Sequence, residues 1–273
     1  MAVGGCVTIS EDALVIGYKR WRAQKYLLDR MTLRDLIRAY VTYPAIQVYA
    51  LLAVVGLVVG IRMTTEVLPV LVAAAAAFLV YPLVWYLLHR YVLHGQWLYK
   101  MPFTAALWKR IHYDHHRNPN DLSVLFGGLH TTLPTILVVT FPIGWLIAGA
   151  PGAAIAVSAA LITTCFYEFC HCVQHLAFKP KLKFLIRIKR LHLAHHFHNE
   201  QGNFGITNYL WDKVLGTYYH KPSDVPLSAT ARNLGYAGEM CERYPWVARL
   251  TDEPEPQPTP RRERRLSQSH GSA

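Results

Sequence analysis

Charged residues are scarce in this chain. Asp, Glu, Lys and Arg together make up 16% of its 273 residues, whereas 52% are hydrophobic and the mean hydropathy is +0.17. A typical soluble domain carries a larger charged fraction. The charges are also segregated, because long apolar blocks alternate with basic segments. This composition argues against a soluble globular protein and favours one embedded in a membrane.

Cysteines and acidic residues are few as well. The five cysteines are odd in number and lack paired spacing, so no disulfide framework is expected. The first 43 residues are polar and basic without an early apolar core, so no cleavable signal peptide is expected. The net charge is +11, but the bases flank apolar blocks instead of lining an aromatic-studded face. We therefore expect them to meet an anionic membrane surface and not nucleic acid.

Four apolar blocks are close to the ~20 residues that a helix needs to cross a bilayer. They cover residues 44–61, 67–88, 131–150 and 153–173. Pro134 and Pro142 predict a kink in the third block, and Pro151–Gly152 predicts a turn before the fourth. The blocks therefore predict an all-α integral membrane protein with four transmembrane helices, arranged as two hairpins.

The remaining segments divide the chain into four parts. We expect residues 1–43 to form an amphipathic interfacial segment, 44–220 a membrane and catalytic domain, and 221–250 a cytoplasmic segment. Residues 251–273 are rich in Pro and charge, which predicts a disordered tail. The helical pattern of the first part begins at Trp21, and its apolar positions are Leu27, Leu28, Met31, Leu33, Leu36 and Ile37.

Lysine and arginine indicate the orientation in the membrane. Seven precede residue 44, only Arg62 lies in the first hairpin turn, none lies in the turn at 150–152, and four lie in 95–129. Residues after 175 are strongly basic. The positive-inside rule then puts both termini and the middle segment in the cytoplasm. This topology brings every histidine cluster to one side of the membrane and to one depth.

Ten of the 14 histidines fall in four clusters, each at or just beyond the end of an apolar block: HRYVLH, HYDHH, HCVQH and HLAHH. Histidines four residues apart share a helical face. His89 and His94 are five apart, so either the helix loosens there or the two residues serve different metals. Neutral imidazole is a common ligand of transition metals, and ten ligands exceed one coordination shell. Two neighbouring metals, enclosed by a cytoplasmic helical cap, are therefore expected.

Other metal proteins fit this pattern less well. A zinc transporter would carry its ligands at the middle of the membrane, a haem protein needs only two axial histidines, and a metalloprotease would show His-Glu-x-x-His. A non-redox histidine-rich protein that binds or transports metal stays open as an alternative. Asp114 and Glu168 lie close enough in sequence to be hydrogen-bond partners of the ring N–H groups.

The four motifs, in this order and separated by two membrane hairpins, resemble those of the membrane fatty acid hydroxylase/sterol desaturase superfamily. The segment NFGITNYLWDKVLGTYY at 203–219 is similar to the one that follows the last motif in fatty acid 2-hydroxylases. The resemblance covers about residues 67–220. It implies a non-haem di-iron enzyme that uses O2 and two electrons to hydroxylate a C–H bond of a membrane lipid or fatty acyl chain. The implied ligands are His89, His94, His112, His115, His116, His171, His175, His192, His195 and His196.

The sequence also departs from the resemblance. It contains no His-Pro-Gly-Gly haem loop, so we expect electrons to come from a separate cytochrome b5- or ferredoxin-like protein. His198 lies outside the motifs and is expected near the metals or the substrate, while Asp212 is expected to be a structural turn acid. Zn²⁺ binds nitrogen ligands more tightly than Fe²⁺ and is expected to replace iron in purified protein. A sterol, hopanoid or carotenoid oxidase, or a desaturase, remains an alternative with the same metal chemistry.

Overall fold

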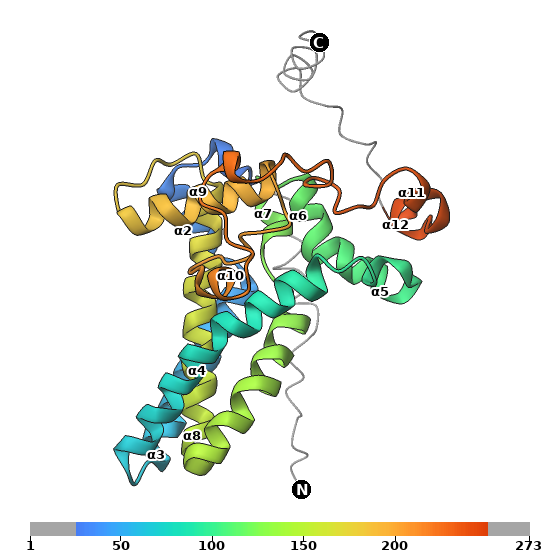
Figure 1. Cartoon of the computed structure of the whole chain (residues 1–273). Coiled ribbons are helices and arrows are strands. Elements are labelled where there is room, and N and C mark those ends of the chain that lie inside the picture. The colour runs from blue at the N-terminus through green and yellow to red at the C-terminus, as the bar shows by residue number, and fades with distance from the viewer. Residues whose placement is uncertain (1–25, 251–273) are drawn as a thin grey trace, which may run out of the picture.

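A computed structural model describes residues 26–250 of the chain. Within this part every regular element is helical, apart from one isolated bridge between Leu27 and Asp121. Long apolar helices form one end of the molecule, and short helices form a cap at the other (Figure 1). The helix expected to begin at Trp21 starts outside the described residues, and the tail expected to be disordered lies wholly outside them.

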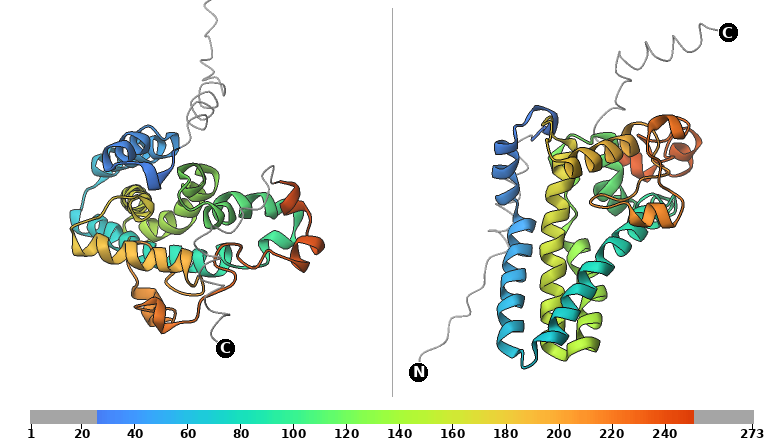
Figure 2. Two further views of the ribbon diagram at one scale, coloured as in Figure 1. Left: turned by 90° about the horizontal axis from the view of Figure 1, so that it is seen from above. Right: turned by 60° about the vertical axis from the view of Figure 1, so that its left-hand side comes forward.

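Between residues 26 and 250, three helical stretches are long and apolar enough to cross a membrane: residues 44–63, 67–93 and 122–175. They contain α3 (Pro44–Met63), α4 (Val67–Leu87) and α8 (Leu129–His175). These stretches make the chain an integral membrane protein. Small residues allow the helices to pack closely, because Ala73 and Ala77 of α4 are buried against Ala156 of α8. Figure 2 shows α3, α4 and α8 standing side by side below the cap.

The third stretch is not one straight helix. Ala148 and Gly149 have non-helical backbone angles, and the φ of Gly149 is +61°. The two parts of α8 fold back on each other there (Figure 1), so closely that a Cβ on Gly144 would overlap the carbonyl oxygen of Gly152. The predicted turn is therefore displaced. It falls at Ala148–Gly149, where only glycine adopts the required angles, and Pro151 occupies the first turn of the returning helix.

The cap is built from short helices before, between and after the long ones. Its elements are η1 (Leu28–Arg30), α2 (Leu33–Val41), η2 (Leu88–Leu93), η3 (Leu98–Lys100), α5 (Pro102–Trp108), η4 (Lys109–Tyr113), α6 (Asp114–Arg117), α7 (Leu122–Leu125), α9 (Lys183–Phe197), α10 (Leu210–Val214), η5 (Pro222–Asp224), α11 (Glu239–Arg243) and α12 (Trp246–Arg249).

The described N-terminal segment is broken where a continuous helix was expected. Thr32 and Asp35 form a capping box, in which the Asp35 N–H donates to the Thr32 hydroxyl and the Thr32 N–H donates to the Asp35 carboxylate. This box starts α2 at Leu33. Leu28 and Leu36 are fully buried in the protein core, whereas Ile37 is exposed. The interfacial position of the segment stays a prediction.

Candidate metal centre

Two π-helical turns deliver histidines to the cap. In η2 the N–H of His94 donates to the carbonyl of His89 at 3.1 Å, a bond that spans five residues. This wider turn places histidines five apart on one face, and their Nε2 atoms lie 3.2 Å from each other. A second π-turn, η4, carries His112. The loosened helix was one of the two explanations for the five-residue spacing, and such turns are frequent at functional sites.

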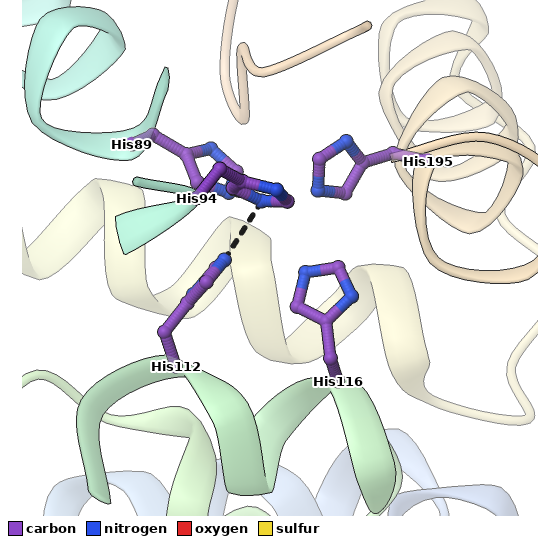
Figure 3. A group of neighbouring side chains, drawn as sticks. All are labelled: His89, His94, His112, His116 and His195. Atoms are coloured by element: carbon purple, nitrogen blue, oxygen red, sulfur yellow. Dashed lines mark hydrogen bonds between the residues drawn. The ribbon is translucent and has the colours of Figure 1, made fainter. Parts of the chain in front are cut away.

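The ten motif histidines meet in two groups. In each group the potential ligand atoms all lie within 4.8 Å of one another. Figure 3 shows the first histidine group, which comes from η2, η4, α6 and α9. The first histidine group consists of His89, His94, His112, His116 and His195, and the second histidine group of His115, His171, His175, His192 and His196.

The central histidine of each His-x-x-His-His motif crosses to the opposite group. His112 and His116, four residues apart, share the first histidine group as their spacing predicts, but His115 lies with the second. In the same way His195 belongs to the first histidine group and not to that of His192 and His196, and its ring lies 5.0 Å from that of His89. Each group therefore takes four histidines from one half of the chain and one from the other. The two groups are interlocked.

The histidines are buried in a way that suits metal ligands. Nine of the ten are less than 9% exposed, and His94 is half-buried. Within the described chain, both ring nitrogens of His115 and His196, and Nε2 of His116 and His195, are buried without a hydrogen-bond partner. Burial of an unpaired polar atom is costly. A nitrogen-binding ion in each group would give a partner to Nε2 of His116 and His195, and to one ring nitrogen each of His115 and His196.

Short distances between histidine nitrogens also indicate that these side chains are metal ligands. Nε2 of His94 lies 2.8 Å from Nε2 of His112, and Nε2 of His175 lies 2.9 Å from Nε2 of His192. Two ligands at right angles on one metal, with bonds of about 2.1 Å, have nitrogens about 3.0 Å apart. The donor sets in both groups therefore fit a metal ion with nitrogen ligands. The two groups also adjoin, because the ring centroids of His116 and His196 are 4.2 Å apart.

Burial keeps the cap histidines neutral. The pKa of His116 and that of His195 are both lowered to about 3, chiefly by loss of hydration, and for His195 also by the neighbouring His116. The pKa of His192 is also well below its ordinary value, mainly because the ring is buried and to a lesser extent because other imidazoles lie nearby. A neutral imidazole has a free lone pair, which is the form that binds a metal.

Backbone carbonyls orient three rings of the first histidine group. Nδ1 of His89 lies 2.6 Å from the carbonyl oxygen of Phe204, and Nδ1 of His195 lies 2.8 Å from that of Gly202. Nδ1 of His116 lies 2.8 Å from the carbonyl oxygen of Ala231. An Nδ1–H that donates to a carbonyl leaves the Nε2 lone pair for a metal. The segment after the last motif therefore fixes the direction in which these rings point.

Asp212 braces that segment and is more than the turn acid expected from the sequence. It is fully buried, and its carboxylate accepts hydrogen bonds from the N–H groups of Phe204 (2.7 Å) and Gly205 (2.9 Å) and from the Thr217 hydroxyl (2.9 Å). These bonds hold the peptide whose carbonyl contacts His89. The sequence does contain a pattern that could have indicated this role of Asp212. It is Asn-Phe-Gly followed by an acidic residue seven positions after the glycine, within the stretch that carries the family resemblance.

The three side chains expected near the ring N–H groups have other hydrogen-bond partners. Both carboxylate oxygens of Asp114 lie 2.8 Å from the Lys109 ammonium, and Nε2 of His198 lies 2.9 Å from the Val225 carbonyl oxygen. Glu168 is buried and accepts a 3.2 Å hydrogen bond from the N–H of Gly127. Their roles beside the metals stay predictions.

Fold and site together define a class: a helical integral membrane protein whose cap encloses a histidine-rich site for two metals. Comparison with known proteins narrows this class. The model of the fatty acid hydroxylase family matches residues 74–217, which include all ten motif histidines. The chain belongs to this family.

Individual relatives agree with the family match. The chain is 34% identical to the ceramide very long chain fatty acid hydroxylase SCS7 of Saccharomyces cerevisiae, over 55% of this chain and 38% of that protein. It is 31% identical to the dihydroceramide fatty acyl 2-hydroxylase FAH2 of Arabidopsis thaliana, over 52% of this chain and 59% of that one. The solved structure of full-length scs7p, in which only the hydroxylase domain is visible, matches with a TM-score of 0.57 and 27% identity over 69% of both chains. The matches cover less than two thirds of these two curated relatives' length.

Proposed function

We propose that the two histidine groups bind two iron ions and that the protein uses O2 to hydroxylate a C–H bond of a membrane lipid or fatty acyl chain. The observation that carries the proposal is the pair of interlocked five-histidine groups. The proposed ligands are the ten motif histidines, five for each ion. Zn²⁺ is expected to compete for the same nitrogen atoms in purified samples.

Membership of the family supports the choice of reaction. The named relatives are hydroxylases of fatty acyl chains, including ceramide and dihydroceramide acyl chains. Bound iron would supply the oxidising power that acid–base side chains lack. In the overall reaction one atom of O2 enters the C–H bond and the other leaves as water, with two electrons and two protons consumed.

The protein's own residues provide burial and a route for the substrate. A narrow cleft lies at the cap end of α4 and α8, lined by Pro82, Trp85, Tyr86, Tyr167 and residues 204–208. Trp85 stacks on Tyr167 with ring centroids 5.7 Å apart, and the ring of Phe204 lies 5.1 Å from that of His94. One wall of this cleft, the Phe204 ring, is therefore also a neighbour of the first histidine group. We propose that the acyl chain enters here and that the buried site excludes water from the oxidised carbon.

Topology and electron supply complete the proposal. The break at Gly149 supports four crossings in two hairpins, with both termini and the histidine groups on the cytoplasmic side as the positive-inside count predicts. We propose that a separate cytochrome b5- or ferredoxin-like protein supplies the electrons from that side.

Lipid mass spectrometry of cells with and without the gene tests the reaction. Acyl species one oxygen atom heavier support hydroxylation, whereas species two hydrogen atoms lighter indicate a desaturase. Absence of any oxidised lipid, with metal crossing the membrane of vesicles that contain the protein, would indicate a transporter.

Ligand variants test the metal assignment. His112→Ala or His195→Ala should abolish oxidation and lower the metal content, while exposed His220→Ala serves as the matched control. Full activity in either ligand variant contradicts the assignment.

A further inference from the structure

Two short cap helices expose apolar faces beside the upper end of α4. On α10, Leu210 and Val214 are four residues apart and 58% and 62% exposed, and Leu215 follows. The opposite side of this helix is buried, because Tyr209 and Asp212 point into the protein. A helical face of this kind is unusual on a surface that meets only water.

The second face belongs to α5. Ala105 and Trp108 are buried in a cluster with Val247 of α12, and the Trp246 indole donates to the Tyr99 carbonyl at 2.7 Å. The other side of α5 carries exposed Pro102, Phe103 and Ala106, and Phe103 is 79% exposed. Trp97, just before α5, is 48% exposed. Thus α11 and α12 cover one side of α5 and leave an apolar side open.

Both faces continue the lipid-facing surface of the spanning helices. The Tyr86 hydroxyl of α4 lies 2.9 Å from the Thr217 hydroxyl, which fixes the α10 segment against the end of α4. The Trp108 indole donates to the Leu93 carbonyl at 3.0 Å, which fixes α5 to the same end. Figure 1 places α10 and α5 at the level of the upper end of α4, lower than α9, α11 and α12.

We propose that these two faces form a membrane collar that lies in the head-group layer of the bilayer. The membrane collar is defined by the exposed apolar residues of both segments: Trp97, Phe103, Ala106, Leu210, Val214 and Leu215. Its occupant is lipid, because it is continuous with apolar helices that already face lipid. Exposed Lys100 and Lys213 beside the two faces suit anionic head groups, and Trp and Lys are typical of this layer.

The membrane collar has a consequence for the cleft. Residues 207 and 208 line the cleft and lead directly into α10. If α10 lies among head groups, the mouth of the cleft opens at the depth where acyl chains begin. This consequence rests on the proposed function, whereas the collar itself requires only that the chain spans a membrane.

Spin labels in lipid vesicles test the collar independently of enzyme activity. Val214→Cys and Phe103→Cys would be labelled with a nitroxide in full-length protein reconstituted in phosphatidylcholine–phosphatidylserine vesicles. Signal from the native cysteines would be subtracted with the unsubstituted protein. Exposed Ser223→Cys in the cap is the water-facing control. We expect both test positions to be severalfold more accessible to O2, relative to a water-soluble nickel complex, than the control position.

Other results of the spin-label experiment would contradict the membrane collar. A nickel accessibility like that of the control at either test position overturns the collar. Shielding of Val214→Cys and Phe103→Cys from both reagents indicates a protein occupant and also overturns it. Spin–spin broadening at the same positions would identify that occupant as a second copy of the chain. Each reading is obtained whether or not the protein oxidises lipid, so failure of the collar and failure of the proposed function are distinguishable.

Discussion

Replacing Asp212 with asparagine should weaken metal binding in the first histidine group alone. The Asp212 carboxylate accepts three hydrogen bonds, two of them from the N–H groups of Phe204 and Gly205. An asparagine has one carbonyl oxygen, so its amide NH2 must face one of the donors that the second carboxylate oxygen served. A buried donor left without an acceptor costs about 1–3 kcal/mol. The substitution therefore destabilises the 203–205 segment without changing its size.

The effect reaches the metal through two carbonyls. Phe204 orients His89 and Gly202 orients His195, and both rings belong to the first histidine group. Loss of such an orienting contact typically lowers metal affinity about 10–100-fold. This range corresponds to about 1.4–2.8 kcal/mol of binding free energy. In the second histidine group, no described ring nitrogen contacts residues 202–205, so its affinity should not change.

A chelator titration measures both sites at once. Purified metal-loaded protein is equilibrated with increasing chelator, and the metal retained per chain is counted by mass spectrometry. In Asp212→Asn, one of two metal equivalents should leave at about 10–100-fold lower chelator concentration, while the other leaves as in the unsubstituted protein. Asp224→Asn is the control, because this exposed carboxylate also accepts two backbone N–H groups, from His220 and Lys221. Equal weakening of both equivalents, or of neither, in a folded variant refutes the reasoning.

Three further predictions concern stability. Burial lowers the pKa of His116 and His195 to about 3, so the unfolded chain binds more protons below its pKa of about 6.5. Stability of the metal-free protein should be full above that pH and should fall toward pH 3, and an unchanged Tm between pH 7 and 5 refutes this. Gly149→Ala should cost about 1–3 kcal/mol in detergent unfolding, because φ of +61° with ψ of −148° suits only glycine. Thr32→Ala should cost about 1 kcal/mol through loss of the cap bond to Asp35, and a Tm equal to that of the unsubstituted protein would contradict it.

Local spacing and hydropathy predicted much of the site. The apolar blocks placed the histidines at one end of the long helices, and the four-residue spacing put His192 with His196 in one group. The five-residue spacing left two explanations open. The π-turn at η2 decides between them, because it brings His94 onto the face of His89. These features depend on residues close together in the chain, which is why the sequence could indicate them.

Features that depend on distant segments were beyond the sequence pattern. The carbonyl partners of His89 and His116 lie 115 residues away, and nothing in the motifs identifies them. The turn in α8 was placed three residues too late, because Pro151 marks the start of a helix as readily as a turn. Glycine at 149, and not proline, supplies the backbone angles that reverse the chain.

The crossing of His115 and His195 changes how the centre assembles. Neither half of the chain can complete a five-histidine group, since each contributes four ligands to its own group and one to the other. A metal bound in either group therefore joins residues from both halves of the chain, and it stabilises the folded cap, in which those residues meet. The two groups also contact each other directly, because the ring centroids of His116 and His196 lie 4.2 Å apart. Each ion keeps its own five ligands, while the one ligand that each group takes from the other half of the chain ties both ions to the same folded cap.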